Sequence, residues 1–290
     1  MIAAVTAVAL DGIRAAAPSG VEVRPLAGGP GAATFVVPAG GDDLEAVAAS
    51  RMVQVVQTLS AGTDWMEPHL PPQATLCAAR GARDIPVAEW VVGALLGALY
   101  GQFRAAHLRT WDYAPPRELH ALRVLIVGFG SIGRAVEARL EAFGARVTGV
   151  ASRARDGVHG AAELPALLPK ADAVVVLLPL SDATRGMIGA AELAAMRDGA
   201  LLVNAGRGPV VDADALVAEL ARGRLEAVLD VTDPEPLPAE HPLWEHALAI
   251  TPHNAGDSEP ADARAVALAL EQLGRFARGE PLEHVVRGPR

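Results

Sequence analysis

Apolar positions follow two patterns along the chain, and the clearer of the two begins near residue 122. From there, short runs that are apolar at every position alternate with longer runs whose apolar residues repeat at helical spacing. Strands covered by helices on both faces have this pattern, so it predicts a doubly wound α/β domain around a parallel sheet. The predicted strands and helices are, in chain order, 124–127, 132–143, 146–150, 161–168, 173–178, 190–196, 201–204, 213–221, 227–231 and 248–251.

The first 80 residues are less regular, because turns rich in glycine and proline interrupt the apolar runs. Short strands are predicted at 2–8, 21–24, 34–37, 53–57 and 75–78, and a helix at 44–49 behind the capping candidates Asp42 and Asp43. A long helix with an apolar stripe is predicted at 86–108, a linker at 111–119, and a last helix at 261–278. These elements indicate a second, smaller α/β domain.

Composition and charge exclude several classes of function. The 290-residue chain has a formal net charge of −9, which argues against nucleic acid or an anionic membrane as its partner. No apolar run reaches the ~18–20 residues that span a membrane, and the apolar start lacks the basic segment of a secretory leader. Cys77 is the only cysteine, so neither an intrachain disulfide nor a thiolate metal cluster can form. We expect a soluble, cytoplasmic protein without a bound metal.

A glycine-rich turn marks the start of the alternating region. The strand 124–127 leads directly into Gly128-Phe129-Gly130-Ser131-Ile132-Gly133, where a predicted helix begins. Gly128 suits a tight turn, Gly130 lets the backbone approach a pyrophosphate, and Gly133 allows close packing of helix on strand. The helix N-terminus supplies N–H groups and a positive dipole end for the phosphates. We therefore predict a Rossmann dinucleotide site that includes Gly128, Gly130, Ser131, Ile132 and Gly133.

The end of the second strand distinguishes between the two nicotinamide cofactors. An acidic residue about 20 positions after the first glycine would bind the ribose 2′-hydroxyl of NAD. The sequence has Ser152, Arg153 and Arg155 in this region instead, followed by Asp156. Because a guanidinium group binds phosphate through two hydrogen bonds, Ser152 and Arg153 favour NADP, with NAD as the alternative.

Three later segments carry residues suited to the chemistry of a 2-oxo acid. Arg207, Glu235 and His253 each follow a predicted strand, at the edge where an open α/β sheet binds its ligands. Arg207 can hold a substrate carboxylate, and His253 can donate a proton as hydride arrives at the carbonyl carbon. Glu235, if it pairs with the ring, would stabilise the imidazolium. The three predict a catalytic site that interconverts a small anionic 2-oxo acid and its 2-hydroxy acid.

At this point the chain resembles the D-isomer-specific 2-hydroxyacid dehydrogenase family, in particular its glyoxylate/hydroxypyruvate reductase-like members. The resemblance covers roughly 119–281 and depends on the glycine fingerprint, Leu178-Pro179-Leu180 with Thr184-Arg185-Gly186, Arg207-Gly208, Glu235-Pro236 and Thr251-Pro252-His253. It implies that Arg207, Glu235 and His253 are the catalytic residues and that Asp230 contacts the nicotinamide amide. It also implies cofactor contacts from Leu178, Pro179, Thr184, Ala205, Gly206, Arg207, His253 and Gly256.

The resemblance also implies a domain organisation. Residues 1–90 and 262–290 would form a flavodoxin-like substrate domain, and 91–261 the dinucleotide domain. Backbone N–H groups of Ala61, Gly62 and Thr63 would bind the substrate carboxylate, and the protein would be a homodimer.

Three departures from the family pattern leave the substrate open. The first domain is short, Gly206 replaces the usual small side chain before the arginine, and the segment between Trp111 and Leu122 is abbreviated. Two other functions remain as alternatives. One is an NAD(P)-sensing dimeric binding protein with negligible turnover, and the other is a formate- or phosphite-type dehydrogenase.

Overall fold

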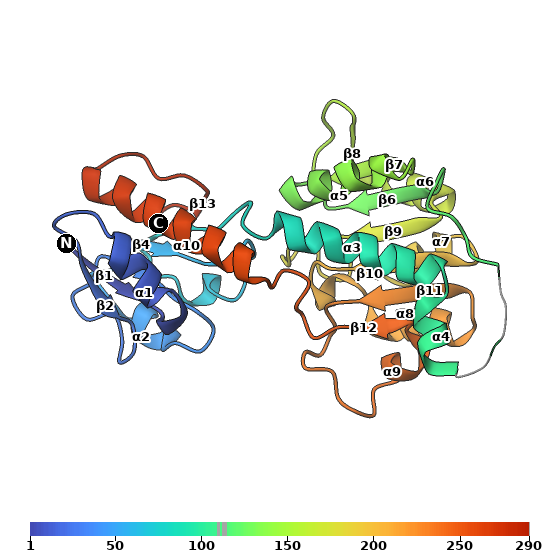
Figure 1. The fold of residues 1–290 in the computed structure, drawn as a ribbon, viewed down its shortest axis with the longest axis horizontal. Helices are drawn as coiled ribbons and strands as arrows, with labels where there is room; N and C mark the ends of the chain where they lie inside the picture. Colours follow the sequence, from blue (N-terminus) through green and yellow to red (C-terminus); the bar gives the residue numbers. More distant parts are fainter. Residues whose placement is uncertain (109–110, 112–114, 290) are drawn as a thin grey trace. The chain divides into compact units, whose positions relative to one another are not determined.

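The computed structural model describes residues 1–108, 111 and 115–289, and the chain divides into two compact units (Figure 1). Unit 1 comprises Met1–Arg83 and Asp257–Arg290, and unit 2 comprises Asp84–Gly256. These boundaries lie a few residues before those expected at 90/91 and 261/262. The reason is that helix α3 (Asp84–Leu99) packs along its length on α5 (Ser131–Ala142) in unit 2, whereas α10 (Glu259–Arg278) packs on α1 (Ala7–Ala16) in unit 1.

Unit 1 is built on a six-stranded sheet with the order β13-β5-β4-β3-β1-β2. The five strands of its first part are parallel, and β13 runs antiparallel to β5. Apart from β13, this is the strand order of flavodoxin-like domains, as predicted. The strands are β1 (Ile2–Val5), β2 (Glu22–Pro25), β3 (Phe35–Val37), β4 (Val55–Gln57), β5 (Thr75–Cys77) and β13 (Val285–Arg287).

Helices cover both faces of this sheet. Helices α1 and α10 share an apolar cluster with one face, and α2 (Leu44–Ala48) packs with the other face, beside the 3-10 helix η1 (Glu67–His69). The predicted strand 2–8 is wrong beyond Val5, where helix α1 follows. Ala9 and Ile13, four residues apart, turn the same side of this alanine-rich helix into the core, so the apolar start continues as a helix.

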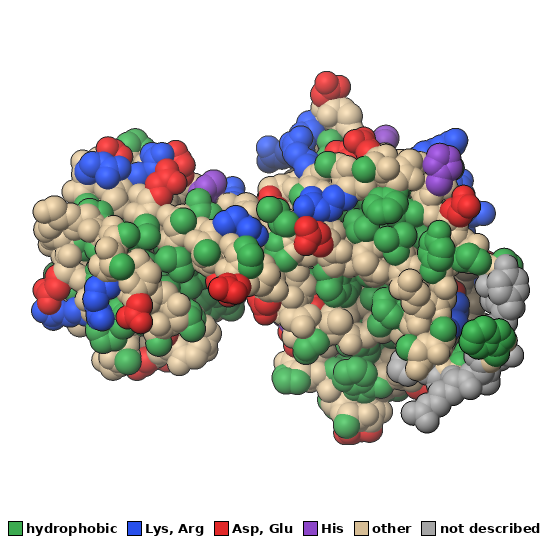
Figure 2. Space-filling model, viewed as in Figure 1, with side chains coloured by type: hydrophobic (Ala, Val, Ile, Leu, Met, Phe, Trp, Pro, Cys, Tyr) green, Lys and Arg blue, Asp and Glu red, His purple; other side chains and the backbone are tan. Residues whose placement is uncertain are grey.

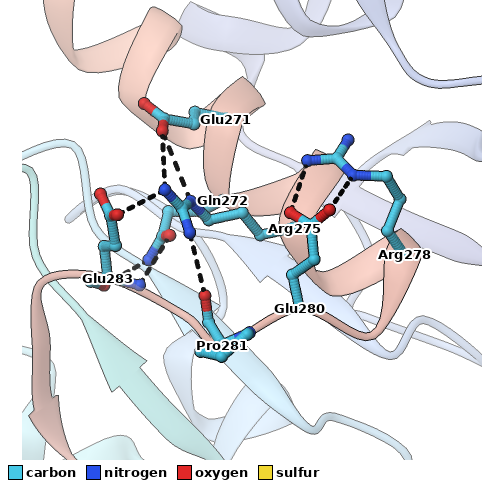
Figure 3. A network of polar contacts seen from close by, with 7 residues as sticks. All are labelled: Glu271, Gln272, Arg275, Arg278, Glu280, Pro281 and Glu283. Carbon is cyan, nitrogen blue, oxygen red and sulfur yellow. Dashed lines mark hydrogen bonds and ion pairs between the residues drawn. The ribbon is translucent and has the colours of Figure 1, made fainter.

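The C-terminal part of the chain is fastened to α10 by polar contacts (Figure 3). The buried amide of Gln272 donates to the carbonyl of Glu283 and accepts from the Glu283 N–H at 3.0 Å, as a neighbouring strand would. Arg275 forms ion pairs with Glu271 and Glu283. These contacts hold β13, which the sequence did not predict, beside β5. Burial in this region raises the pKa of the Cys77 thiol to about 11.

Unit 2 is built on a seven-stranded parallel sheet with the order β12-β11-β10-β9-β6-β7-β8. Counted from β6, this is the Rossmann order 3-2-1-4-5-6 with one further strand, so the doubly wound prediction is confirmed. The strand order reverses between β6 and β9. The strands are β6 (Arg123–Val127), β7 (Arg146–Ala151), β8 (Val158–Gly160), β9 (Ala173–Val176), β10 (Ala200–Asn204), β11 (Leu225–Leu229) and β12 (Ala249–Ile250).

Alternate residues of these strands enter two separate apolar clusters. Ile126, Val175 and Val203 pack against α3 and α5, whereas Leu125 and Val174 pack on the opposite face against α6, α7, α8 and α9. The remaining helices are α4 (Gln102–Leu108), η2 (Ala161–Glu163), α6 (Leu164–Leu167), η3 (Leu168–Lys170), α7 (Ala190–Ala195), η4 (Gly208–Val210), α8 (Ala213–Ala221) and α9 (Leu243–His246).

The predicted helix 86–108 is two helices rather than one. Gly101 has a φ of 66°, in the left-handed region, which ends α3 before α4 begins. The predicted linker 111–119 lies partly outside the described residues. Where the structure describes it, at 111 and 115–119, it is neither helix nor strand.

Charges of both signs lie interspersed on the visible face of the molecule (Figure 2). The positive side chains do not gather there into a broad basic surface of the kind that binds nucleic acid, in keeping with the net charge of −9. Among the helices that the structure describes, none combines the length and the apolar character needed to cross a bilayer.

Candidate active site

The glycine-rich turn between β6 and α5 leaves room for a phosphate group. Gly128 has a φ of 109°, and a Cβ there would lie 2.6 Å from the carbonyl carbon of Leu177. A Cβ on Gly133 would lie 2.9 Å from the Gly128 carbonyl oxygen, so both positions require glycine. At Gly130, in contrast, a Cβ would meet nothing within 4 Å, and this residue caps α5 without a side chain. The backbone at the start of α5 is therefore not covered by a side chain of Gly130, which fits a dinucleotide pyrophosphate.

The region after β7 carries exposed basic residues beside this turn. Ser152 and Arg153 follow the last residue of β7 and are exposed. The Arg155 guanidinium donates to the carbonyl of Phe129, inside the glycine-rich turn. The predicted cofactor residues included Arg153 but not Arg155, although the sequence shows both in the same turn. Only the fold reveals that Arg155 contacts the glycine-rich turn.

The loop after β10 holds Arg207 between two other backbone segments. A Cβ on Gly206 would lie 2.7 Å from the carbonyl oxygen of Leu178, and a Cβ on Gly208 would lie 1.9 Å from that of Thr232. The loop therefore packs against the segment after β9 on one side and the segment after β11 on the other. This contact explains why Gly206 replaces a larger residue here.

The histidine and the acid that were predicted to act together are in contact. His253 Nδ1 lies 2.5 Å from Glu235 Oε1. An ionised carboxylate can only accept a hydrogen bond, so a contact of this kind uses an N–H at Nδ1 of the ring and leaves Nε2 for another partner. The two side chains are 44% and 38% exposed, so small molecules in solution can reach them.

A buried carboxylate fixes the turn that carries this histidine. Asp230 is 3% exposed and accepts hydrogen bonds from Thr251 Oγ1 at 2.5 Å and from the N–H groups of Asn254 and Ala255 at 3.0 Å. His253 has a φ of 53°, a left-handed conformation that costs a side-chain-bearing residue about 1–3 kcal/mol. Its N–H donates to the Asp230 carbonyl at 2.8 Å. The bonds to Asp230 hold the histidine in this strained position.

The other predicted cofactor residues of unit 2 lie on the same edge of the sheet. Leu178 and Pro179 follow β9, and Thr184 Oγ1 donates to the Pro179 carbonyl at 2.7 Å, which closes the loop. Ala205 follows β10, and Gly256 is the last residue of unit 2. The carboxyl edge of the parallel sheet therefore brings together the glycine-rich turn and the arginine, acid and histidine loops.

The predicted substrate loop lies in unit 1, after β4. Its carbonyl groups point to partners within the unit: the Gly62 carbonyl accepts from Ser60 Oγ at 2.6 Å and from Trp65 Nε1 at 3.2 Å. Within the described part of the chain, the N–H groups of Ala61, Gly62 and Thr63 have no acceptor. Consecutive N–H groups with no acceptor suit an anion such as a carboxylate.

The chain is similar in sequence to known proteins of one family. A family model described as "D-isomer specific 2-hydroxyacid dehydrogenase, NAD binding domain" matches residues 96–255, more than half of the chain. Glyoxylate/hydroxypyruvate reductase A of Citrobacter koseri is 39% identical over 178 residues, a match that spans 59% of this chain and 56% of that protein.

Two solved structures resemble the whole chain. A D-isomer specific 2-hydroxyacid dehydrogenase from Xanthobacter autotrophicus, in complex with NADPH and MES, has a TM-score of 0.86 at 30% identity and covers 99% of this chain and 98% of its own. An NADPH-dependent glyoxylate/hydroxypyruvate reductase from Sinorhizobium meliloti, in complex with NADP and sulfate, has a TM-score of 0.85 at 29% identity and covers 98% of both chains.

Proposed function

Because the chain belongs to the D-isomer specific 2-hydroxyacid dehydrogenase family, we propose that it reduces small 2-oxo acids, glyoxylate and hydroxypyruvate first among them, with NADPH. Family membership makes it an NAD(P)-dependent oxidoreductase that acts on the CH–OH group of 2-hydroxy acids. The observation that carries the proposal is the His253–Glu235 pair at 2.5 Å, on the sheet edge that also presents Arg207.

We assign each polar side chain a separate task. Arg207 holds the substrate carboxylate and polarises the neighbouring carbonyl. His253 gives the proton on Nε2 to the carbonyl oxygen, while Glu235 on Nδ1 orients the ring and stabilises the imidazolium. The bound cofactor supplies the hydride. In the reverse direction, the neutral ring of His253 takes the proton of the hydroxyl group. Asp230 holds the histidine turn, and we also assign to it the contact with the nicotinamide amide.

The unit 1 loop is assigned to carboxylate binding. The N–H groups of Ala61, Gly62 and Thr63, which have no acceptor among the described residues, support this role, because consecutive backbone donors suit an anion. An anionic substrate of a protein with net charge −9 needs such locally placed donors.

NADPH is the cofactor that the residues after β7 favour. No carboxylate occupies the last position of β7 or the two that follow it, and Arg153 is exposed there. We expect Arg153→Ala to weaken NADPH binding by about 10- to 100-fold, the effect of about 1–3 kcal/mol from a hydrogen bond to a charged group. NADH binding should change little. Arg146→Ala, at the other end of the same strand, is the matched control, and fluorescence titration measures the affinities of both cofactors for the wild type and the two variants. Equal weakening of both cofactors would remove Arg153 from 2′-phosphate recognition.

We further propose a cytoplasmic homodimer. The exposed apolar side chains of Tyr100 and Phe143, which line one hollow where α3 and α5 end, support a partner surface on unit 2. Sedimentation velocity tests the assembly, because a monomer at micromolar concentration would contradict it.

The reaction is tested by NADPH and NADH oxidation with glyoxylate, hydroxypyruvate, pyruvate, phenylpyruvate and 2-oxoisocaproate. We expect the highest kcat/KM with NADPH and one of the first two acids. Cofactor binding without turnover of any acid would favour the NAD(P)-sensing binding protein. Reduction of NADP⁺ by formate or phosphite would favour the formate- or phosphite-type dehydrogenase.

A further inference from the structure

We infer that Asn204 is a positioning residue that sets the place of Arg207 in the active site. The inference concerns the same site as the proposed function and rests on the role given there to Arg207. It concerns the last residue of β10, which is buried at the carboxyl edge of the sheet and was not among the predicted site residues.

The side-chain amide of Asn204 bridges the arginine loop. Asn204 is 1% exposed. Its Oδ1 accepts from the Gly206 N–H at 3.1 Å, and its Nδ2 donates to the Arg207 carbonyl at 3.2 Å. The first bond is an Asx turn, in which a side chain imitates a turn of the backbone. Only a side chain that both donates and accepts can form the pair of bonds.

The same residue connects the arginine loop to the histidine turn. The Asp230 N–H donates to the Asn204 carbonyl at 2.9 Å, and the Asp230 carbonyl accepts from the His253 N–H at 2.8 Å. An unbroken series of hydrogen bonds therefore runs from the Arg207 backbone through two buried strand ends to the His253 backbone. Rotation of the turn at Asn204 would move the guanidinium relative to the imidazole.

The fit of the loop makes small displacements important. Gly206 and Gly208 contact the backbone of Leu178 and Thr232, so the loop has no free space into which it can shift without loss of these contacts. Reduction requires the substrate carboxylate on Arg207 and the substrate carbonyl at His253 at the same time. A misplacement of about 1 Å in such an arrangement can lower the rate by ~10²-fold.

Asn204→Ala tests the inference. We expect KM for glyoxylate and the Kd of oxamate, an unreactive analogue, to rise at least ~10-fold, and kcat to fall ~10-fold or more. The Kd of NADPH should stay within about three-fold, because the cradle at Gly128 and Gly130 does not involve this side chain. Asn204→Ser should restore part of the loss, since a hydroxyl forms the same turn more weakly. The fluorescence of bound NADPH follows oxamate binding, so this Kd is measured without any turnover.

Gln272 in unit 1 supplies a matched control. It is 2% exposed, and its amide also donates to a carbonyl and accepts from an N–H, both of Glu283 (Figure 3). Gln272→Ala therefore removes the same type of buried bonds far from the arginine loop in sequence and in a different unit. We expect it to lower the unfolding temperature. KM and oxamate affinity should stay within about two-fold of wild type, which is roughly the scatter among neutral variants.

Arg207→Ala distinguishes a failure of the role inferred for Asn204 from a failure of the role proposed for Arg207. If it raises KM and oxamate Kd but Asn204→Ala and Asn204→Ser shift them no more than Gln272→Ala does, Asn204 is only structural and the inference is overturned. If Arg207→Ala itself leaves both values unchanged, the proposed role of Arg207 fails and the inference fails with it. Should Asn204→Ala not fold, as judged by NADPH binding, the serine variant alone decides.

Discussion

Replacement of Gly208 by alanine should push the arginine loop away from the segment after β11. A Cβ at this position would lie 1.9 Å from the Thr232 carbonyl oxygen, 2.2 Å from its carbonyl carbon and 2.8 Å from the Asp233 nitrogen. All three atoms belong to the backbone, so no side chain can rotate to make room. Thr232 and Asp233 lead directly to Glu235, and Gly208 directly follows Arg207, so any separation acts on both loops that carry proposed catalytic residues.

The size of the displacement follows from the contact distance. Ordinary van der Waals contact begins at 3.4 Å, so the two segments must separate by about 1.5 Å if they remain otherwise intact. A shift of this size between a substrate-holding and a proton-donating group should lower kcat/KM by ~10²-fold or more, equivalent to about 2.7 kcal/mol. Overpacking should also lower the free energy of unfolding, by about 1–3 kcal/mol.

Steady-state oxidation of NADPH by glyoxylate measures the first effect, and thermal unfolding measures the second. Gly93→Ala is the control, because this glycine lies in α3 and a Cβ there meets nothing within 4 Å. It should leave kcat/KM unchanged and stabilise the helix slightly. A Gly208→Ala enzyme with kcat/KM within five-fold of wild type (roughly 1 kcal/mol) would show that the loops tolerate separation, and the reasoning from this contact would be refuted.

Two further predictions test other parts of unit 2. His253→Ala should lower kcat for oxo-acid reduction by ~10²–10⁴-fold with little change in NADPH affinity, and turnover within a few-fold of wild type would exclude His253 as the proton donor. Hydrogen bonds from Arg123 hold the pKa of Asp172 below its ordinary value, so this carboxylate stabilises the fold at neutral pH and loses that effect as the pH falls through its lowered pKa. Asp172→Asn should therefore lower the free energy of unfolding by about 1 kcal/mol at pH 7 and by less below about pH 4, and a difference that does not depend on pH would contradict this linkage.

The sequence was informative where one local pattern decides the structure. The run 124–127 is apolar throughout and is followed by a glycine-rich turn, so strand, turn and helix could be predicted together. The helix α1 was missed because its first residues continue the apolar run of β1, and short apolar runs do not distinguish strand from helix. Strand β13 was missed because its pairing partner, β5, lies some 200 residues earlier in the chain.

In the site, too, local patterns could be predicted from the sequence, whereas contacts between distant residues could not. Arg207, Glu235 and His253 could be proposed from residue type and position after a strand, but the contact of Glu235 with His253 joins residues 18 positions apart and needed the fold. Arg155 was visible in the sequence as a basic residue after β7, but nothing there showed that it contacts the glycine-rich turn, and Asn204 had no distinctive signal. Their importance comes from backbone atoms that they contact, and backbone contacts leave no trace in residue type.

The order of elements along the chain has a consequence for synthesis on the ribosome. Unit 2 is one continuous segment, 84–256, and has all its strands before α10 is translated. Unit 1 begins first, yet the sheet face that carries Ala3, Phe35 and Cys77 remains uncovered by α10 until the final segment emerges. Domains fold as units during translation, so we expect the nascent chain to carry a finished second unit while the first still exposes apolar surface. Chaperones that bind such surfaces should therefore be able to engage the N-terminal residues until α10 emerges, even after the second unit has folded.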